Sequence, residues 1–209
     1  NRKGVFASGI LFAPREILHE LADFVLPEIE VHYVEDGSTG QAAEIAAIAP
    51  DLPVETFADL REMRRADLSV VATNSTRRIV EADFIKPGAI VIDDSFPKNV
   101  PDTLSRDRPD VIALEGGAVR LPRSVEVDRA RNLPNIADVP FTRMISCQEV
   151  YGCFAETLTL AVYDQRANYG LGRADPVLAA DILGKARRLG IGMAPLQFYG
   201  EALSDARVT

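Results

Sequence analysis

The run "DLSVVATN", residues 67–74, is a short hydrophobic segment that ends in small polar residues, and "GAIVIDDS" at 88–95 repeats this pattern. Both runs are rich in Val and Ile and are too short for typical helices, so each is predicted to be a β-strand. Nearly continuous apolar strands of this kind are typical of a parallel sheet that is covered on both faces.

The same kind of pattern continues outward over residues 1–120. Further strands are predicted at 4–10, 29–35, 53–57 and 110–117, and helices at 14–26, 40–49 and 58–66. This alternation of strands and helices predicts an α/β fold with a doubly wound, mostly parallel, Rossmann-like sheet.

A change of composition follows the predicted sheet. Residues 121–145 contain three prolines and are expected to be a loop, and two helices then follow. The last helix lies within 174–190, where Asp175 is the expected cap, Pro176 the first residue and Gly190 the end. We therefore predict a Rossmann-like dinucleotide-binding domain at 1–120, and a connecting loop with helices packed on the sheet at 121–209.

Composition narrows the functional class. The chain has 209 residues, 47% of them hydrophobic and 26% charged, and its net charge of −8 argues against a nucleic acid partner. No apolar run reaches the 18 residues that a membrane span needs. The two cysteines lie six positions apart without metal-ligand spacing. We therefore expect a cytoplasmic protein without a metal, whose oligomeric state stays open.

The segment "VYGCFAETLTLAVY", residues 150–163, carries Cys153. Its apolar residues fall on one helical stripe, which comprises Val150, Cys153, Phe154, Thr157, Leu158, Ala161 and Val162. Ser146 and Glu149 have the spacing of a capping box, so the helix is expected to begin near Cys147 with Cys153 facing the core. By this pattern alone, Cys153 is either a buried packing residue or a nucleophile.

The glycine turns that would hold a dinucleotide are incomplete. In "ASGILFAPRE" (7–16) only Gly9 matches the G-x-G-x-x-G pattern, because Phe12 and Arg15 occupy later positions. A second turn, "EDGSTGQAAE" (35–44), offers Ser38 and Thr39. Its leading Glu35 and Asp36 favour NAD over NADP, because carboxylates suit a ribose hydroxyl and repel a 2′-phosphate.

Polar and glycine residues follow the later strands, at the edge where ligands bind in such sheets. The cofactor candidates there are Thr73, Asn74, Ser75, Asp94, Gly116 and Gly117, and the substrate candidates are Lys98 and Asn99. Each of these residues also has an ordinary interpretation as part of a turn.

Three segments carry a family resemblance: "VIDDSFPKNV" (91–100), "VIALEGGAV" (111–119) and "GCFAETLTL" (152–160). In this order they resemble the cyanobacterial long-chain acyl-[acyl carrier protein] reductases, and the sheet half more distantly resembles glutamyl-tRNA reductase and shikimate dehydrogenase. The resemblance implies that Cys153 attacks the thioester of an acyl carrier. It also implies that hydride from NADPH then releases an aldehyde.

Other residues near Cys153 enter this hypothesis. Glu156 lies one turn later and would orient or deprotonate the thiol. Cys147 is the rival nucleophile, because the predicted helix start would stabilise its thiolate. Arginine pairs on the surface are candidates for docking an acidic carrier protein.

Two departures from the family keep alternatives open. The family has a further N-terminal region for which this chain has no room, and Phe12 and Arg15 degrade the glycine turn. The first alternative is a non-catalytic Rossmann-like binding subunit or fragment. The second is a dehydrogenase of a small carbonyl compound in which Cys153 is structural.

Overall fold

The computed structural model describes residues 3–8, 29–34, 50, 54–73, 75–124, 146, 148–166 and 176–204. The chain divides into two compact units, Asn1–Gly116 and Gly117–Thr209.

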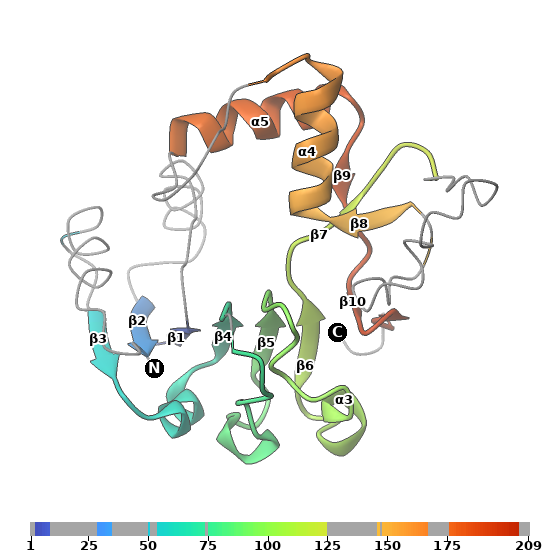
Figure 1. Cartoon of the computed structure of the whole chain (residues 1–209). Coiled ribbons are helices and arrows are strands. Elements are labelled where there is room, and N and C mark those ends of the chain that lie inside the picture. The colour runs from blue at the N-terminus through green and yellow to red at the C-terminus, as the bar shows by residue number, and fades with distance from the viewer. Residues whose placement is uncertain are drawn as a thin grey trace. The chain divides into compact units, whose positions relative to one another are not determined.

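The first unit contains a parallel six-stranded sheet. Its strands are β1 (Lys3–Ser8), β2 (Ile29–Val34), β3 (Val54–Phe57), β4 (Leu68–Val71), β5 (Ile90–Asp93) and β6 (Ile112–Glu115). The order across the sheet is β3-β2-β1-β4-β5-β6, and every adjacent pair is parallel. This is the strand order of the Rossmann fold, so the predicted α/β class is confirmed. Figure 1 shows β4, β5 and β6 side by side, with their carboxyl ends at one edge.

Short helical segments connect the described strands of this unit. A 3₁₀ helix, Leu60–Arg65, begins where the Asp59 carboxylate accepts a hydrogen bond from the Arg61 N–H, and it replaces the longer helix predicted at 58–66. A second 3₁₀ turn covers Ala82–Phe84, and α3 covers Leu104–Asp107. The predicted helices at 14–26 and 40–49 lie outside the described residues. Fully buried apolar side chains fill the core, among them Met63, Val71, Val91, Leu104 and Val111.

The second unit combines two helices with short antiparallel strands. Its elements are β7 (Ala118–Arg120), β8 (Glu149–Tyr151), α4 (Gly152–Val162), α5 (Pro176–Arg188), β9 (Gly192–Met193), β10 (Gln197–Phe198) and β11 (Glu201–Ala202). Strand β7 pairs with both β8 and β9, and β10 pairs with β11. The two C-terminal helices are confirmed, whereas the strands were not predicted.

The end of α5 follows the expected pattern. Pro176 is its first residue, and the expected cap Asp175 lies outside the described residues. Gly190 has a φ of 78°, its N–H donates to the Arg187 carbonyl at 3.0 Å, and the Ile191 N–H donates to the Ala186 carbonyl at 3.0 Å. These two bonds form a Schellman motif, which requires the left-handed backbone that glycine adopts without strain. Ile191 then packs into the core of this unit with Leu121 and Ala155.

The predicted start of the Cys153 helix is wrong. The Ser146 N–H does donate to a Glu149 carboxylate oxygen at 3.1 Å, but α4 begins only at Gly152. Glu149–Tyr151 instead forms strand β8, because its backbone pairs with Ala118–Arg120. A backbone that is paired in a sheet cannot also make the bonds of a helix.

The predicted buried face of this helix is also wrong. Ala155 and Thr159 are the buried residues of α4, whereas Phe154, Leu158 and Val162 are 38%, 38% and 59% exposed. The apolar periodicity located a helix, but it did not identify the face that packs on β7 and β8.

Within the described part of the chain, none of the helices has the length and apolar character that crossing a bilayer requires.

Candidate functional site

The carboxyl edge of the first unit is organised around the buried carboxylate of Asp93, the last residue of β5. One of its oxygens accepts a hydrogen bond from the Ser95 N–H at 3.0 Å. The other accepts from the N–H groups of Asn99 and Val100, at 2.9 and 2.8 Å. Asp93 therefore holds the backbone of the loop that follows β5.

Asn99 connects this loop to the loop after β4. Its Oδ1 accepts from the Thr73 hydroxyl at 2.9 Å, and its Nδ2 donates to the carbonyl oxygens of Ser75 and Pro97 at 3.2 and 2.7 Å. Ser95 adds a second connection, because its hydroxyl accepts from the Thr73 N–H at 3.1 Å and donates to the carbonyl of Val71 at 3.2 Å. The structure thus brings the candidates Thr73, Ser75 and Asn99 together.

Lys98 connects the same loop to β6. Its Nζ lies 2.7 Å from a Glu115 carboxylate oxygen and donates to the Asp93 carbonyl at 2.7 Å. The side chains of Lys98 and Glu115 are only 12% and 3% exposed. Because this ion pair is largely shielded from water, it holds the loop after β5 to the end of β6. The substrate candidate Lys98 therefore makes an internal contact.

Asp94 is exposed, whereas its neighbour Asp93 is buried. Partial burial of its carboxyl raises the pKa, the Lys98 ammonium opposes this, and the nearby carboxylates of Asp93 and Glu115 raise the pKa further. Of the two adjacent aspartates, only Asp94 is accessible from solvent.

The two glycines after β6 have different surroundings. A Cβ on Gly116 would lie 2.6 Å from the Asp94 Cβ and 2.8 and 2.9 Å from the Asp94 backbone. Gly117 has a φ of 68°, in the left-handed region. Close packing within the protein is therefore enough to require glycine at 116.

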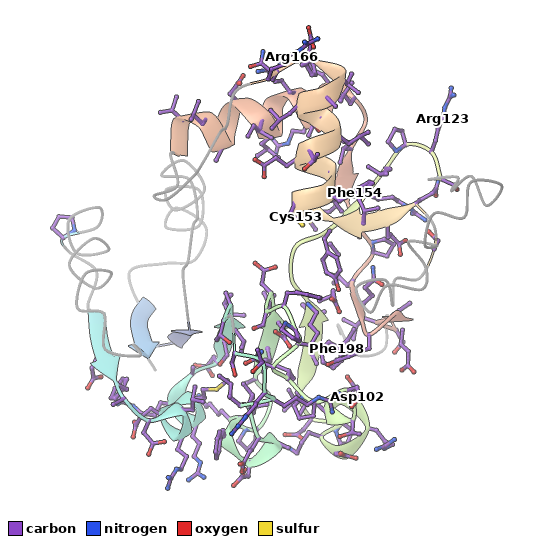
Figure 2. The ribbon with its side chains drawn as sticks, in the orientation of Figure 1. Asp102, Arg123, Cys153, Phe154, Arg166 and Phe198 are labelled. Atoms are coloured by element: carbon purple, nitrogen blue, oxygen red, sulfur yellow. The ribbon has the colours of Figure 1, made fainter. Side chains whose placement is uncertain are left out.

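Cys153 lies in the second unit, as the second residue of α4, and it is exposed (Figure 2). The preceding Gly152 donates its N–H to the Gly117 carbonyl at 2.7 Å, and no side chain caps this end of the helix. Glu156, one turn later, is also exposed. Among the hydrogen bonds of the described residues, none joins Glu156 to the sulfur.

A buried carboxylate that sequence reasoning did not single out as a site residue organises the second unit. Glu149 contacts Ser146, the Gln197 amide at 3.4 Å and the Arg120 guanidinium at 3.8 Å. A shallow hollow of about 360 Å³ lies nearby, lined by Arg120, Leu121, Pro122, Gln148, Gly190, Gly192 and Met193. None of the predicted site residues lines this hollow.

Several sequence candidates lie outside the described residues. They are Gly9, Ser38, Thr39, Asn74 and the rival nucleophile Cys147, together with Phe12 and Arg15 of the degraded turn. Within the described ranges, no group of three His, Cys, Asp or Glu side chains could hold a metal ion.

Sequence reasoning also did not name Ser95, Glu115 or Asp93 among the site candidates. One signal for Asp93 was available: Val91 and Asp93 share one face of β5, so a charged residue follows an apolar one on the buried side.

Comparison with known proteins gives limited similarity. No family model matches the chain. A curated relative, "Aminotransferase PigE" of Serratia sp. (strain ATCC 39006), is 30% identical over 141 residues, which is 66% of this chain and 15% of that protein. The chain therefore corresponds to a small part of this relative.

Two solved structures show distant likeness. Thermococcus litoralis Δ1-pyrroline-2-carboxylate reductase, in complex with NADH and L-proline, is 18% identical with a TM-score of 0.37, over 45% of this chain and 30% of that one. The nucleotide-binding domain of Thermoplasma volcanium glutamyl-tRNA reductase is 20% identical with a TM-score of 0.34, over 53% of this chain and 74% of that one. The Rossmann-like fold itself is established by the strand order of the sheet.

Proposed function

We propose that this chain reduces an acyl thioester to an aldehyde with NAD(P)H, through an acyl group carried on Cys153. The observation that carries the proposal is the position of Cys153: an exposed thiol in the first turn of a helix, preceded by a glycine. A packing role would bury this sulfur. The resemblance to acyl carrier protein reductases is the second support.

Acyl transfer uses groups of the α4 amino terminus. The Cys153 sulfur attacks the thioester carbonyl, a new C–S bond forms, and the carrier sulfur leaves as a thiolate that takes up a proton. Negative charge develops on the carbonyl oxygen during this step. The first N–H groups of a helix have no acceptor within the helix, and no side chain caps α4. The Gly152 N–H donates to the Gly117 carbonyl, so the N–H groups that follow it in the first turn suit this oxygen. Glu156 is the candidate group for orienting the thiol.

The proposal assigns the dinucleotide to the carboxyl edge of the first unit. Thr73 and Ser75 are partly exposed and Asp94 is exposed, so they offer hydroxyl, backbone and carboxylate groups to a ribose. In sheets with this strand order, dinucleotides bind beyond the carboxyl ends of the strands. In the proposed reaction, NAD(P)H supplies a hydride and solvent a proton, and together they convert the Cys153 thioester to an aldehyde and free thiol. The acidic Glu35 and Asp36 favour NAD, whereas the family resemblance favours NADP.

An acyl substrate also suits the exposed surface of α4. Phe154, Leu158 and Val162 form an exposed apolar stripe that begins beside Cys153. Burying such side chains against an alkyl chain is favourable by roughly 25 cal/mol per Å². The substrate class is therefore an acyl thioester, carried by acyl carrier protein or coenzyme A.

The relative's printed name agrees with an aldehyde product. An aminotransferase converts a carbonyl compound to an amine, and an aldehyde is such a compound. The reaction proposed for this chain would supply an aldehyde.

The direct test is intact-mass spectrometry after incubation with an acyl-carrier thioester. The wild-type chain and C147S should gain the mass of the acyl group, and C153S should not. Adding NADH or NADPH should then remove this mass and release an aldehyde. Acylation that persists in C153S would refute the assignment of the nucleophile.

A second candidate is a non-catalytic Rossmann-like binding subunit, which the bulky Phe12 and Arg15 in the glycine turn favour. Titration with NADH and NADPH separates the two proposals. A chain that binds neither dinucleotide and accepts no acyl group supports the binding subunit.

A further inference from the structure

We propose that Asn99 is a positioning residue for dinucleotide binding: its side-chain amide sets the spacing between the loop after β4 and the loop after β5. This inference rests on the proposed dinucleotide site and assigns Asn99 a role different from the substrate contact predicted from sequence.

The Asn99 amide is occupied on both of its sides. The residue is fully buried. Its oxygen accepts from Thr73 at 2.9 Å, and its nitrogen donates to the carbonyls of Ser75 and Pro97 at 3.2 and 2.7 Å. Only a side chain with one acceptor and two donors makes all three contacts. Asp lacks the donors, and an apolar residue lacks both kinds of group.

Asn99 itself is held in place by its backbone. Its N–H donates to the Asp93 carboxylate at 2.9 Å, and its carbonyl accepts from the Val80 N–H at 3.2 Å. Asp93 is the last residue of β5, so its bond to the Asn99 N–H fixes the position of Asn99 relative to the sheet. The amide can therefore hold the β4 loop at a defined distance from β5.

The Asn99 amide positions two residues of the loop after β4, Thr73 and Ser75. The Thr73 hydroxyl donates to Asn99 and accepts from the Ser75 N–H at 3.2 Å, so one contact orients both residues. Strand β4 lies beside β1 at the point where the strand order reverses, and β5 is the next strand. Ligands bind at this point in such sheets. Thr73 and Ser75 remain partly exposed, as groups that meet a ligand must be.

The test compares two identical chemical changes in the full chain. T73V removes the hydroxyl that bonds to Asn99. T159V removes a buried hydroxyl that donates to the Ala155 carbonyl at 2.7 Å in α4. T73V loses two hydrogen bonds, to Asn99 and from the Ser75 N–H, and T159V loses one. Each bond is worth about 0.5–1.5 kcal/mol, so both variants should be less stable, and T73V somewhat more so. Only T73V should bind NADH or NADPH more weakly, by about 3- to 10-fold in a fluorescence titration.

A double-mutant cycle identifies the contact responsible. N99A should weaken dinucleotide binding at least as much as T73V. The double variant T73V/N99A should lose less affinity than the sum of the two single losses, because both single changes remove the bond between Thr73 and Asn99. If N99A does not fold, N99D decides the question: it lacks the two donors to Ser75 and Pro97 and changes no group offered to the ribose, so it should bind dinucleotide more weakly, and unchanged affinity overturns the proposal.

The outcomes separate this inference from the proposed function. A wild-type chain that binds dinucleotide, with unchanged affinity in T73V and N99A, overturns the positioning role and leaves the proposed function standing. Equal weakening in T73V and T159V also overturns it, because a general loss of stability would then be the cause. A wild-type chain that binds neither dinucleotide overturns both.

Discussion

Replacing Asp93 with Asn removes a charge from the centre of the loop after β5 while keeping the shape of the side chain. The buried carboxylate accepts three backbone N–H bonds, from Ser95, Asn99 and Val100. An amide has one acceptor oxygen, so in its better orientation it keeps the bonds from Asn99 and Val100. Its NH₂ group then faces the Ser95 N–H, and two donors are left without an acceptor.

The magnitude follows from these contacts. Hydrogen bonds to charged groups are worth about 1.5–3 kcal/mol each, and a buried donor without an acceptor costs about 1–3 kcal/mol. One bond is lost and two are weakened, with partial relaxation, so we expect D93N to lose about 2–4 kcal/mol of unfolding free energy. For a chain of this size, that corresponds to a Tm lower by roughly 4–16 °C.

The assay is urea unfolding followed by circular dichroism, together with a thermal melt. D102N is the matched control: the exposed pair of Asp102 with Arg78, at 2.9 Å, is worth about 0–1 kcal/mol. A loss in D93N no larger than in D102N would refute the assignment of Asp93 as the residue that holds the loop.

Three further predictions test the same edge of the sheet. G116A should lose about 1–3 kcal/mol in urea unfolding because its Cβ would meet the Asp94 backbone, whereas G192A, with no atom within 4 Å, should lose less; equal losses would contradict the close approach. K98M should lose about 3–5 kcal/mol of unfolding free energy, because it leaves the buried Glu115 carboxylate without its cation. K98M/E115Q should recover part of this loss, and a double variant less stable than K98M would contradict the ion-pair account. The raised pKa of Asp94 means that the folded state binds the carboxyl proton more tightly than the unfolded state. The protonated carboxyl therefore contributes stability at low pH, and this contribution is lost as the pH rises from 3.8 through the folded-state pKa. D94N should flatten this part of a curve of unfolding free energy against pH, and an unchanged curve would contradict the shift.

Local patterns were reliable where a segment's own composition sets its structure. Short runs rich in Val and Ile predicted the strands β4, β5 and β6, because such residues are stable when buried on both faces of a sheet. Pro176 and Gly190 marked the ends of α5, because proline fits a first turn and glycine adopts the left-handed backbone beyond a last one.

The candidate site was only partly predictable. Thr73, Ser75, Asp94 and Lys98 were expected at the carboxyl edge, and the structure places them there. Which of them face inward depended on contacts between loops about 26 residues apart, such as the bond from Thr73 to Asn99. Sequence spacing carries no information about such partners.

The sequence alone determined the alternation of strands and helices, hence the doubly wound class, because the periodicity of apolar residues records which side chains avoid water. The tertiary structure alone decided where α4 begins and which of its faces is buried. Strand pairing of Glu149–Tyr151 with β7 displaced the helix start, and packing of Ala155 and Thr159 turned Phe154 and Leu158 outward with Cys153. Both outcomes depend on residues distant in the chain, which compete for the same backbone groups and the same apolar surface.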